Sequence, residues 1–289
     1  MSLAIVTDST SYLDETYIQE NNITVLPLMV TFSDGSYREM ADIDLRTFYD
    51  KMEKLDEIPS SSQPSYGQIV KTLKNLAQDH DRILALTISS GISGTYNSFA
   101  MAAEEIDEAE VTVIDSQLTC RYLANYIDLA IQMDRKGHTI EEITERIEQA
   151  KASTEVILSV NNLTNFKKSG RISNAAAFLG DMLQIRPILE FQEGEIVATD
   201  KVRTNKRVIR YILDKFDQAY QASSAPLKIV LLESFQGQNE QIQLLKEELA
   251  ENYPEVIVEE GIVGPVIGTH TGPTVYSLGW MIDFEKEGI

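Results

Sequence analysis

A loop rich in hydroxyls and glycines is the stretch of this chain most suited to chemistry. It reads Ser89-Ser-Gly-Ile-Ser-Gly-Thr95, and it lies between the apolar run Ile83–Ile88 and a helix-like segment from Tyr96. Hydroxyls and bare backbone N–H groups in such a loop can approach a ligand closely, and the N-terminus of the next helix favours negative charge. Open α/β sheets also bind small molecules at the carboxyl ends of their strands. The Ser89–Thr95 loop therefore predicts an anion-binding site.

Three further clusters could contribute to such a site. Thr7-Asp-Ser-Thr10 is either the cap of a following helix or a support for a ligand or loop. The segment Pro59-Ser-Ser-Ser-Gln-Pro-Ser65 is either a linker that caps the next helix or a second source of hydroxyls. In the glycine-rich segment 264–273, His270 stands between glycine turns. A lone histidine is usually structural, but these glycine and threonine neighbours favour a functional role.

A hydrolase would need an activated nucleophile, and Ser93 with His270 is the candidate pair. The nucleophile elbow requires Gly-x-Ser-x-Gly after a strand, whereas this chain has Thr95 at the last glycine position. Neither a Walker A sequence nor a dinucleotide-binding fingerprint follows a strand. The residues that could bind a metal show no ligand spacing: His80, His138, His270 and Cys120. The sequence predicts no hydrolytic, phosphoryl-transfer, redox or metal machinery of its own.

Composition narrows the class of protein. The chain has 289 residues, of which 43% are hydrophobic and 24% charged, as is ordinary for a soluble globular protein. Its net charge of −20 disfavours nucleic-acid binding, because phosphate backbones repel a surface of that sign. A single cysteine, Cys120, excludes an internal disulfide framework. With no basic leader and no run of roughly 18 apolar residues, the expected location is the cytoplasm.

Apolar runs alternate with amphipathic segments in the first part of the chain. The expected strands are residues 3–7, 23–32, 83–88, 111–114 and 156–160. The expected helices are residues 12–20, 45–55, 64–78, 96–106, 118–136 and 140–152. Asp34-Gly35 is a hairpin turn signal. This order gives βαβ units and predicts a parallel sheet covered by helices.

The texture of the sequence changes near residue 161, where polar and basic residues gather. Beyond this point we expect a helix at 174–183, a hairpin around 192–195, a helix at 206–220, a strand–helix pair at 229–232 and 242–251, a strand at 256–258 and a glycine-rich tail. The predicted fold is therefore α/β with two domains, residues 1–160 and 161–289. The second domain is also expected to be α/β.

Taken together, these motifs resemble the DegV family, the fatty-acid-binding subunits of bacterial fatty acid kinase, over nearly the whole chain. The motifs are Ile5-Val-Thr-Asp-Ser-Thr10, the Pro27-Leu28 strand, Ser61-Ser-Gln-Pro64, the Ser89–Thr95 loop, Lys168-Ser-Gly-Arg-Ile-Ser173 and Gly268-Thr-His-Thr-Gly-Pro273. The resemblance implies that a lipid chain is held between the two domains and that a partner performs the phosphoryl transfer. Ser61 departs from the threonine often found there, which keeps the hydroxyl and loses a methyl group.

Matching these motifs implies that Ser61, Ser93 and His270 bind the fatty-acid carboxylate. Each buried methylene of the tail contributes about 0.8 kcal/mol, whereas an unpartnered buried carboxylate costs several kcal/mol. Two serine hydroxyls and a histidine N–H would satisfy the carboxylate, and a protonated His270 would add a charge-assisted bond. The expected function is a non-enzymatic carrier, without a cofactor, that presents a long-chain fatty acid to a separate kinase for acyl-phosphate formation.

One basic segment stands out in this acidic chain. Residues 167–210 contain nine basic and five acidic residues, a net charge of +4. The segment is either a solvated helix face or a docking surface for the kinase. The resemblance assigns docking to arginines that match Arg171 and Arg203.

Two other functions stay open. One is a lipid esterase or acyl-transfer enzyme that uses Ser93 with His270, and the other is a lipid sensor without a kinase partner. The expected partners of the carrier are a long-chain fatty acid, the catalytic subunit of fatty acid kinase and, transiently, a membrane. Nucleic acid is not among them, and a monomer is the default expectation.

Overall fold

The computed structural model describes residues 3–161, 163–173, 185–234 and 239–288. By internal contacts the chain forms two compact units: Met1–Gln149 with Gly264–Val266, and Ala150–Val263 with Ile267–Ile289. Each unit has its own sheet and its own core. The helix expected at 174–183 lies outside the described residues. Among the described residues, no helix combines the length and the apolar character that a bilayer crossing requires.

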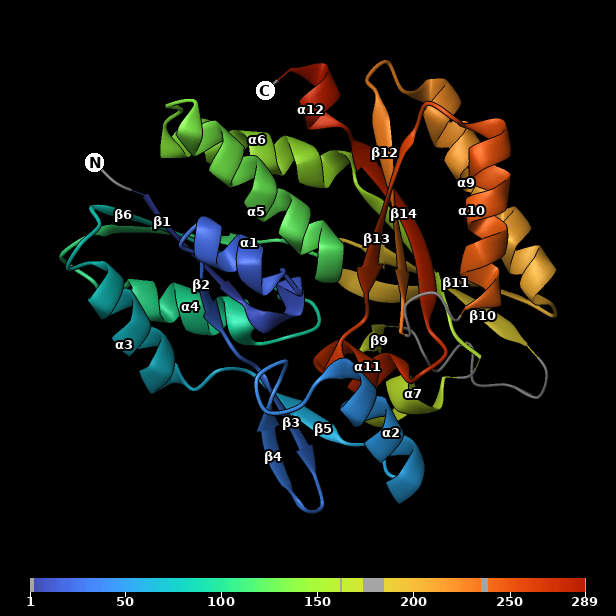
Figure 1. Cartoon of the computed structure of the whole chain (residues 1–289), viewed down its shortest axis with the longest axis horizontal. Helices are drawn as coiled ribbons and strands as arrows, with labels where there is room; N and C mark the ends of the chain where they lie inside the picture. Colours follow the sequence, from blue (N-terminus) through green and yellow to red (C-terminus); the bar gives the residue numbers. More distant parts are fainter. Residues whose placement is uncertain (1–2, 162, 174–184, 235–238, 289) are drawn as a thin grey trace. The chain divides into compact units, whose positions relative to one another are not determined.

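The main sheet of the first unit is parallel, as predicted. Its strand order is β2-β1-β6-β7, with the bounds Thr24–Leu26, Leu3–Asp8, Arg82–Thr87 and Glu110–Asp115. Helices α3 (Tyr66–Leu76) and α4 (Thr95–Ala103) lie side by side on it (Figure 1). The core between helices and sheet includes the buried side chains of Val6, Leu73 and Phe99.

The strand predicted at 23–32 is split into two strands of different sheets. Pro27 lies at the break, because it has no N–H to donate to a ladder. Beyond it, β3 (Met29–Phe32) is the central strand of an antiparallel sheet with β4 (Gly35–Arg38) and β5 (Ser60–Ser62). The β3–β4 hairpin confirms the turn predicted at Asp34-Gly35.

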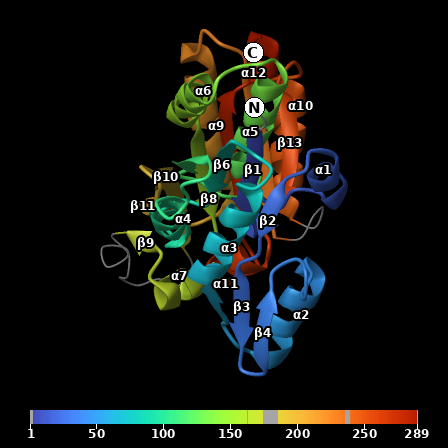
Figure 2. The same ribbon diagram turned by 90° about the vertical axis from the view of Figure 1, so that its left-hand side faces the viewer.

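Helix α2 (Leu45–Leu55) has the bounds expected from its apolar spacing. Asp44 caps the helix and accepts a hydrogen bond from the Thr47 N–H at 2.8 Å. Its Phe48 ring lies 5.9 Å from the ring of Phe32 on β3, centroid to centroid. Figure 2 shows α2 beside the β3–β4 hairpin. Aromatic packing therefore fixes this small subdomain of the first unit.

The helix predicted at 12–20 begins later than expected. Tyr12 has a φ of 45°, in the left-handed region, and ends a short 3-10 turn, η1 (Ser9–Ser11). Asp14 then caps α1 (Glu15–Glu20) and accepts a hydrogen bond from the Thr16 N–H. The helices that follow β7 are α5 (Cys120–Arg135), which contacts η1, and α6 (Ile140–Ser153).

The second unit contains a seven-stranded mixed sheet of order β13-β12-β14-β8-β10-β11-β9. In that order the strands are Ile257–Ile262, Leu227–Glu233, Tyr276–Ile282, Glu155–Ser159, Arg186–Gln192, Glu195–Val202 and Ile172–Ser173. The prediction that residues 156–160 continue the parallel sheet is wrong, because β8 pairs antiparallel with both β10 and β14. The sheet of this unit is therefore mixed rather than parallel.

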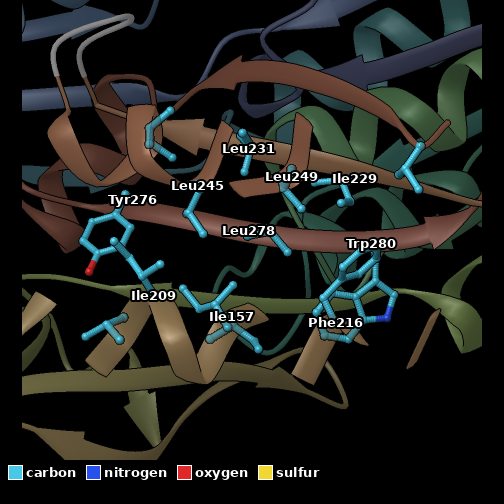
Figure 3. Packing of buried hydrophobic residues seen from close by; sticks show 14 of the residues in the cluster. Ile157, Ile209, Phe216, Ile229, Leu231, Leu245, Leu249, Tyr276, Leu278 and Trp280 are labelled. Carbon is cyan, nitrogen blue, oxygen red and sulfur yellow. The ribbon is translucent and has the colours of Figure 1, made fainter. Parts of the chain in front are cut away.

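Helices α9 (Asn205–Ala222) and α10 (Glu240–Asn252) confirm the helices predicted at 206–220 and 242–251. They pack on the sheet through the core shown in Figure 3, where the Phe216 ring lies 5.6 Å from that of Trp280. The β10–β11 hairpin is also confirmed, and Glu193 and Gly194 turn it with φ values of 50° and 84°. Positive φ at both positions is what a tight hairpin requires.

The prediction that a glycine-rich tail follows residue 258 is wrong, because most of these residues form helices and strands. They include helix α11 (Pro265–Thr271) and β14, which is an interior strand of the sheet between β12 and β8. The described part of the unit also contains the short helices α7 (Thr164–Ser169) and α12 (Phe284–Glu287). His270 therefore belongs to a helix and not to a loop.

Candidate functional site

Two aspartates tie together the loops at the carboxyl ends of β1, β6 and β7. The Asp8 carboxylate accepts hydrogen bonds from the Thr10 N–H at 3.0 Å, the Thr10 hydroxyl at 2.6 Å and the Ile88 N–H at 2.7 Å. Asp115 accepts hydrogen bonds from the N–H and the hydroxyl of Ser90 at 3.1 Å and 2.5 Å. Asp8 thus caps the short turn η1, whereas Asp14 caps the helix α1 that follows, and Asp8 also supports the loop after β6.

The Ser89–Thr95 loop folds back on itself before α4. The Ser93 N–H donates to the Ser89 carbonyl at 3.1 Å, and the Ser93 hydroxyl lies 2.9 Å from that of Thr95. The Ser93 oxygen also accepts a weaker hydrogen bond from the Thr95 N–H at 3.3 Å. Within the described part of its own unit, Ser93 therefore has hydroxyl and backbone partners and no base to take its proton.

Gln63 brings the loops of Ser61 and Ser93 together. Ser61 is half-buried in β5, opposite Val30, and the following Gln63 donates a hydrogen bond to the Ser98 hydroxyl at 2.5 Å. A Cβ atom on Gly94 would lie only 2.3 Å from the Gln63 side-chain oxygen. The Gln63 amide therefore lies directly over the Gly94 backbone. The sequence analysis noted Gln63 only as part of a motif and missed this bridging role.

A buried carboxylate in the same unit was missed altogether. Glu39 is 1% exposed and accepts hydrogen bonds from the Ser9 hydroxyl at 2.6 Å, the Tyr12 hydroxyl at 2.7 Å and the Val266 N–H at 2.7 Å. Burial raises the pKa of Glu39 to about 7, although its three donors act in the opposite direction. The nearby charge of Asp8 raises that pKa further.

His270 lies near the end of α11, in the part of this helix that belongs to the second unit. Burial lowers the pKa of His270 to about 4, and the positive charge of Arg171 adds to this effect. Desolvation therefore favours the neutral ring in the ligand-free chain. Asn165 steadies the end of the helix and donates a hydrogen bond to the Thr269 carbonyl at 3.0 Å.

The two arginines expected to dock a kinase do not lie next to one another. Arg171 is exposed and immediately precedes β9, whose Ile172 pairs with Ile196 near the start of β11. Arg203 is also exposed and follows the last residue of β11. Seven residues of extended chain separate Arg203 from Ile196, a span of roughly 23 Å. The two arginines therefore lie at opposite ends of one strand.

The structure thus brings together the loops of Ser61 and Ser93, while His270 belongs to the second unit. In the ranges that the structure describes, no group of three or more His, Cys, Asp or Glu side chains could hold a metal ion. The first unit provides hydroxyls and backbone N–H groups in loops at the carboxyl ends of its parallel strands. Such groups suit an anionic guest.

Comparisons with known proteins cover nearly the full length of the chain. The family model described as "Uncharacterised protein, DegV family COG1307" matches residues 2–283. Protein DegV of Bacillus subtilis is 32% identical over 281 residues, which cover 97% of this chain and 99% of that protein. The crystal structure of DegV from Bacillus subtilis, described as a fatty acid binding protein, has a TM-score of 0.89 and covers 98% of this chain and all of that one. A Thermus thermophilus DegV family protein, described for its fatty acid binding, is 29% identical with the same TM-score and the same coverage.

Replacing Glu39 by glutamine should change how stability depends on pH. The wild-type folded state keeps a proton on Glu39 up to about pH 7, whereas a free glutamate loses it near pH 4.5. Wild-type stability therefore falls as pH rises through this window, by about 3 kcal/mol from this group. Glu39→Gln cannot titrate and should lack that decline. Urea unfolding of both proteins at pH 5 and pH 8 measures it, and identical changes would contradict the assigned protonation.

His270 should affect the pH dependence of stability in the opposite direction to Glu39. Its imidazole stays neutral in the folded state down to about pH 4, whereas a free histidine binds a proton below about 6.5. Acidification across that window therefore favours unfolding of the wild type, because the unfolded chain takes up the proton. His270→Asn should lose less stability than the wild type between pH 7 and pH 5 in the same unfolding assay. An equal loss would show that His270 is not buried as described.

Proposed function

We propose that this chain, which belongs to the DegV family, binds a long-chain fatty acid and holds its carboxylate with Ser61, Ser93 and His270. The observation that supports this most strongly is the likeness over nearly the full length to two structures described as fatty-acid-binding, at 29–32% identity. The hydroxyl-rich loops at the edge of the parallel sheet supply the type of donor that a carboxylate requires.

Energetics favour this kind of guest. Burial of the hydrocarbon tail contributes about 0.8 kcal/mol for each methylene, which is ample for tight binding. The carboxylate opposes binding unless its oxygens receive hydrogen bonds. Two serine hydroxyls and one imidazole N–H provide three donors, and none needs to carry a charge beforehand. A bound carboxylate beside His270 would raise the pKa of the imidazole from its low ligand-free value.

The arrangement around Ser93 favours a carrier over an esterase. An acyl-transfer enzyme needs a base that removes the serine proton. The Ser93 hydroxyl instead shares a hydrogen bond with Thr95 and accepts another from the Thr95 N–H. A fluorophosphonate probe separates the two functions, because covalent modification of Ser93 would establish the esterase and exclude the carrier.

The carrier would present its carboxylate to a separate kinase that forms an acyl phosphate. The segment 167–210 carries a net charge of +4, whereas the whole chain carries −20. It is therefore the part of the chain suited to an acidic or nucleotide-bearing partner. Because Arg171 and Arg203 lie at opposite ends of β11, a partner that contacts both must cover the length of this strand. A lipid sensor without a kinase would bind the fatty acid equally well, so the kinase assay below separates it from the carrier.

Ser93→Ala and Ser61→Ala should each weaken fatty-acid binding by about tenfold or more, since a hydrogen bond to a charged group contributes roughly 1.5–3 kcal/mol. Ser62→Ala is the matched control, because Ser62 is the exposed neighbour of Ser61 on the same strand. Calorimetric titration with palmitate measures all three. Wild-type affinity in both Ser93→Ala and Ser61→Ala would remove the serines from the proposed site.

Arg171→Glu and Arg203→Glu, made singly, should each reduce phosphorylation of the bound lipid by a fatty acid kinase catalytic subunit with ATP. Binding of palmitate should stay at the wild-type level, because both side chains are exposed. Charge reversal at a docking contact replaces attraction by repulsion. Loss of lipid binding in either variant would instead assign that arginine to the ligand or the fold.

A further inference from the structure

Glu39 is a buried carboxyl group that has no role in the proposed binding site. Its three donors come from two parts of the chain: Ser9 and Tyr12 in and just after η1, and Val266 in α11. Only the Val266 donor is distant in sequence, 227 residues away. A carboxylate buried this completely is costly unless it is fully hydrogen-bonded. The three hydrogen bonds therefore offset the cost of burying Glu39.

The segment Gly264–Val266, which belongs to the first unit, contacts the rest of this unit at a second point. A Cβ atom on Gly264 would lie 2.1 Å from the Tyr12 ring, so the ring packs against bare backbone at this position. Tyr12 also donates its hydroxyl to Glu39. One side chain thus contacts both the segment and the carboxylate that holds it, and these contacts all lie within the first unit.

Helix α11 begins in this segment and carries His270. Val266 and His270 are four residues apart in Pro265–Thr271, about one helical turn, so they share a face of the helix. The Val266 N–H belongs to the first turn, where no carbonyl of the helix can accept it. Glu39 supplies the acceptor at 2.7 Å.

We infer that Glu39 is a positioning residue for His270: its carboxylate fixes the first turn of α11 through the Val266 N–H and thereby sets the place of the imidazole one turn later. The inference rests on the proposed role of His270 as a carboxylate ligand. Glu39 itself does not touch the fatty acid. Its loss should therefore act on ligand binding only through the environment of His270.

The test is the imidazole spectrum of the ligand-free protein, labelled with ¹⁵N-histidine. The chain has three histidines, and His80 and His138 serve as internal controls because both lie outside α11. Glu39→Ala and Glu39→Asp should shift the His270 resonances and raise its titration midpoint towards the ordinary value. Glu39→Gln should leave both as in the wild type, because its amide oxygen can still accept from Val266. Tyr12→Phe removes one donor, keeps the Val266 bond and should have a smaller effect.

The outcome separates this inference from the proposed function. Unchanged His270 resonances in folded Glu39→Asp would overturn the positioning role, whatever the fatty-acid affinity. If Glu39→Ala fails to fold, Glu39→Asp decides, because it keeps a carboxyl group and only shortens the side chain. A titration of the wild type with palmitate tests the function independently, since a His270 signal that does not respond would exclude it as a ligand. Where both roles hold, Glu39→Asp should weaken palmitate binding about tenfold, and Glu39→Gln should not.

Discussion

A carboxylate that leaves water must receive hydrogen bonds, and this constraint organises the first unit. Asp8 holds its own turn and the end of β6, and Glu39 holds η1, Tyr12 and the start of α11. In both cases the donors are hydroxyls and backbone N–H groups rather than basic side chains. Hydroxyls are also two of the three donors that we propose for the carboxylate of the fatty acid, with the His270 imidazole as the third. Hydroxyl donors would then satisfy the carboxylate of the ligand as they satisfy Asp8 and Glu39.

The sequence predicted those elements of the fold whose determinants are local. Helix α2 was predicted with its bounds from the spacing of its apolar residues, and Gly194 marked the β10–β11 hairpin. Long-range pairing was not visible. The strand at 23–32 is divided at Pro27, a signal that was available, and β8 joined the mixed sheet only through partners later in the chain. The strand β14 was missed because the glycines before it suggested a tail, although Tyr276–Ile282 is a nearly continuous apolar run.

The sequence likewise predicted some residues of the candidate site and missed others. Ser61, Ser93 and His270 came from motifs in the sequence, whereas Glu39 has nothing in its local sequence to distinguish it. Its partners are 30 and 27 residues before it and 227 residues after it, so only the folded chain could reveal them. The low pKa of the His270 imidazole was not visible in the sequence for a related reason, because burial depends on packing that one sequence does not display. Residue types thus indicated the chemistry, and the fold decided which groups carry a charge.

Native mass spectrometry of the purified protein tests the central proposal most directly. The account predicts a species heavier than the bare chain by the mass of one long-chain fatty acid, and denaturation should release that acid intact. Incubation with palmitate should convert any bare protein to the same one-to-one complex. A bare chain that stays bare after incubation with saturated and unsaturated long-chain acids would contradict the account.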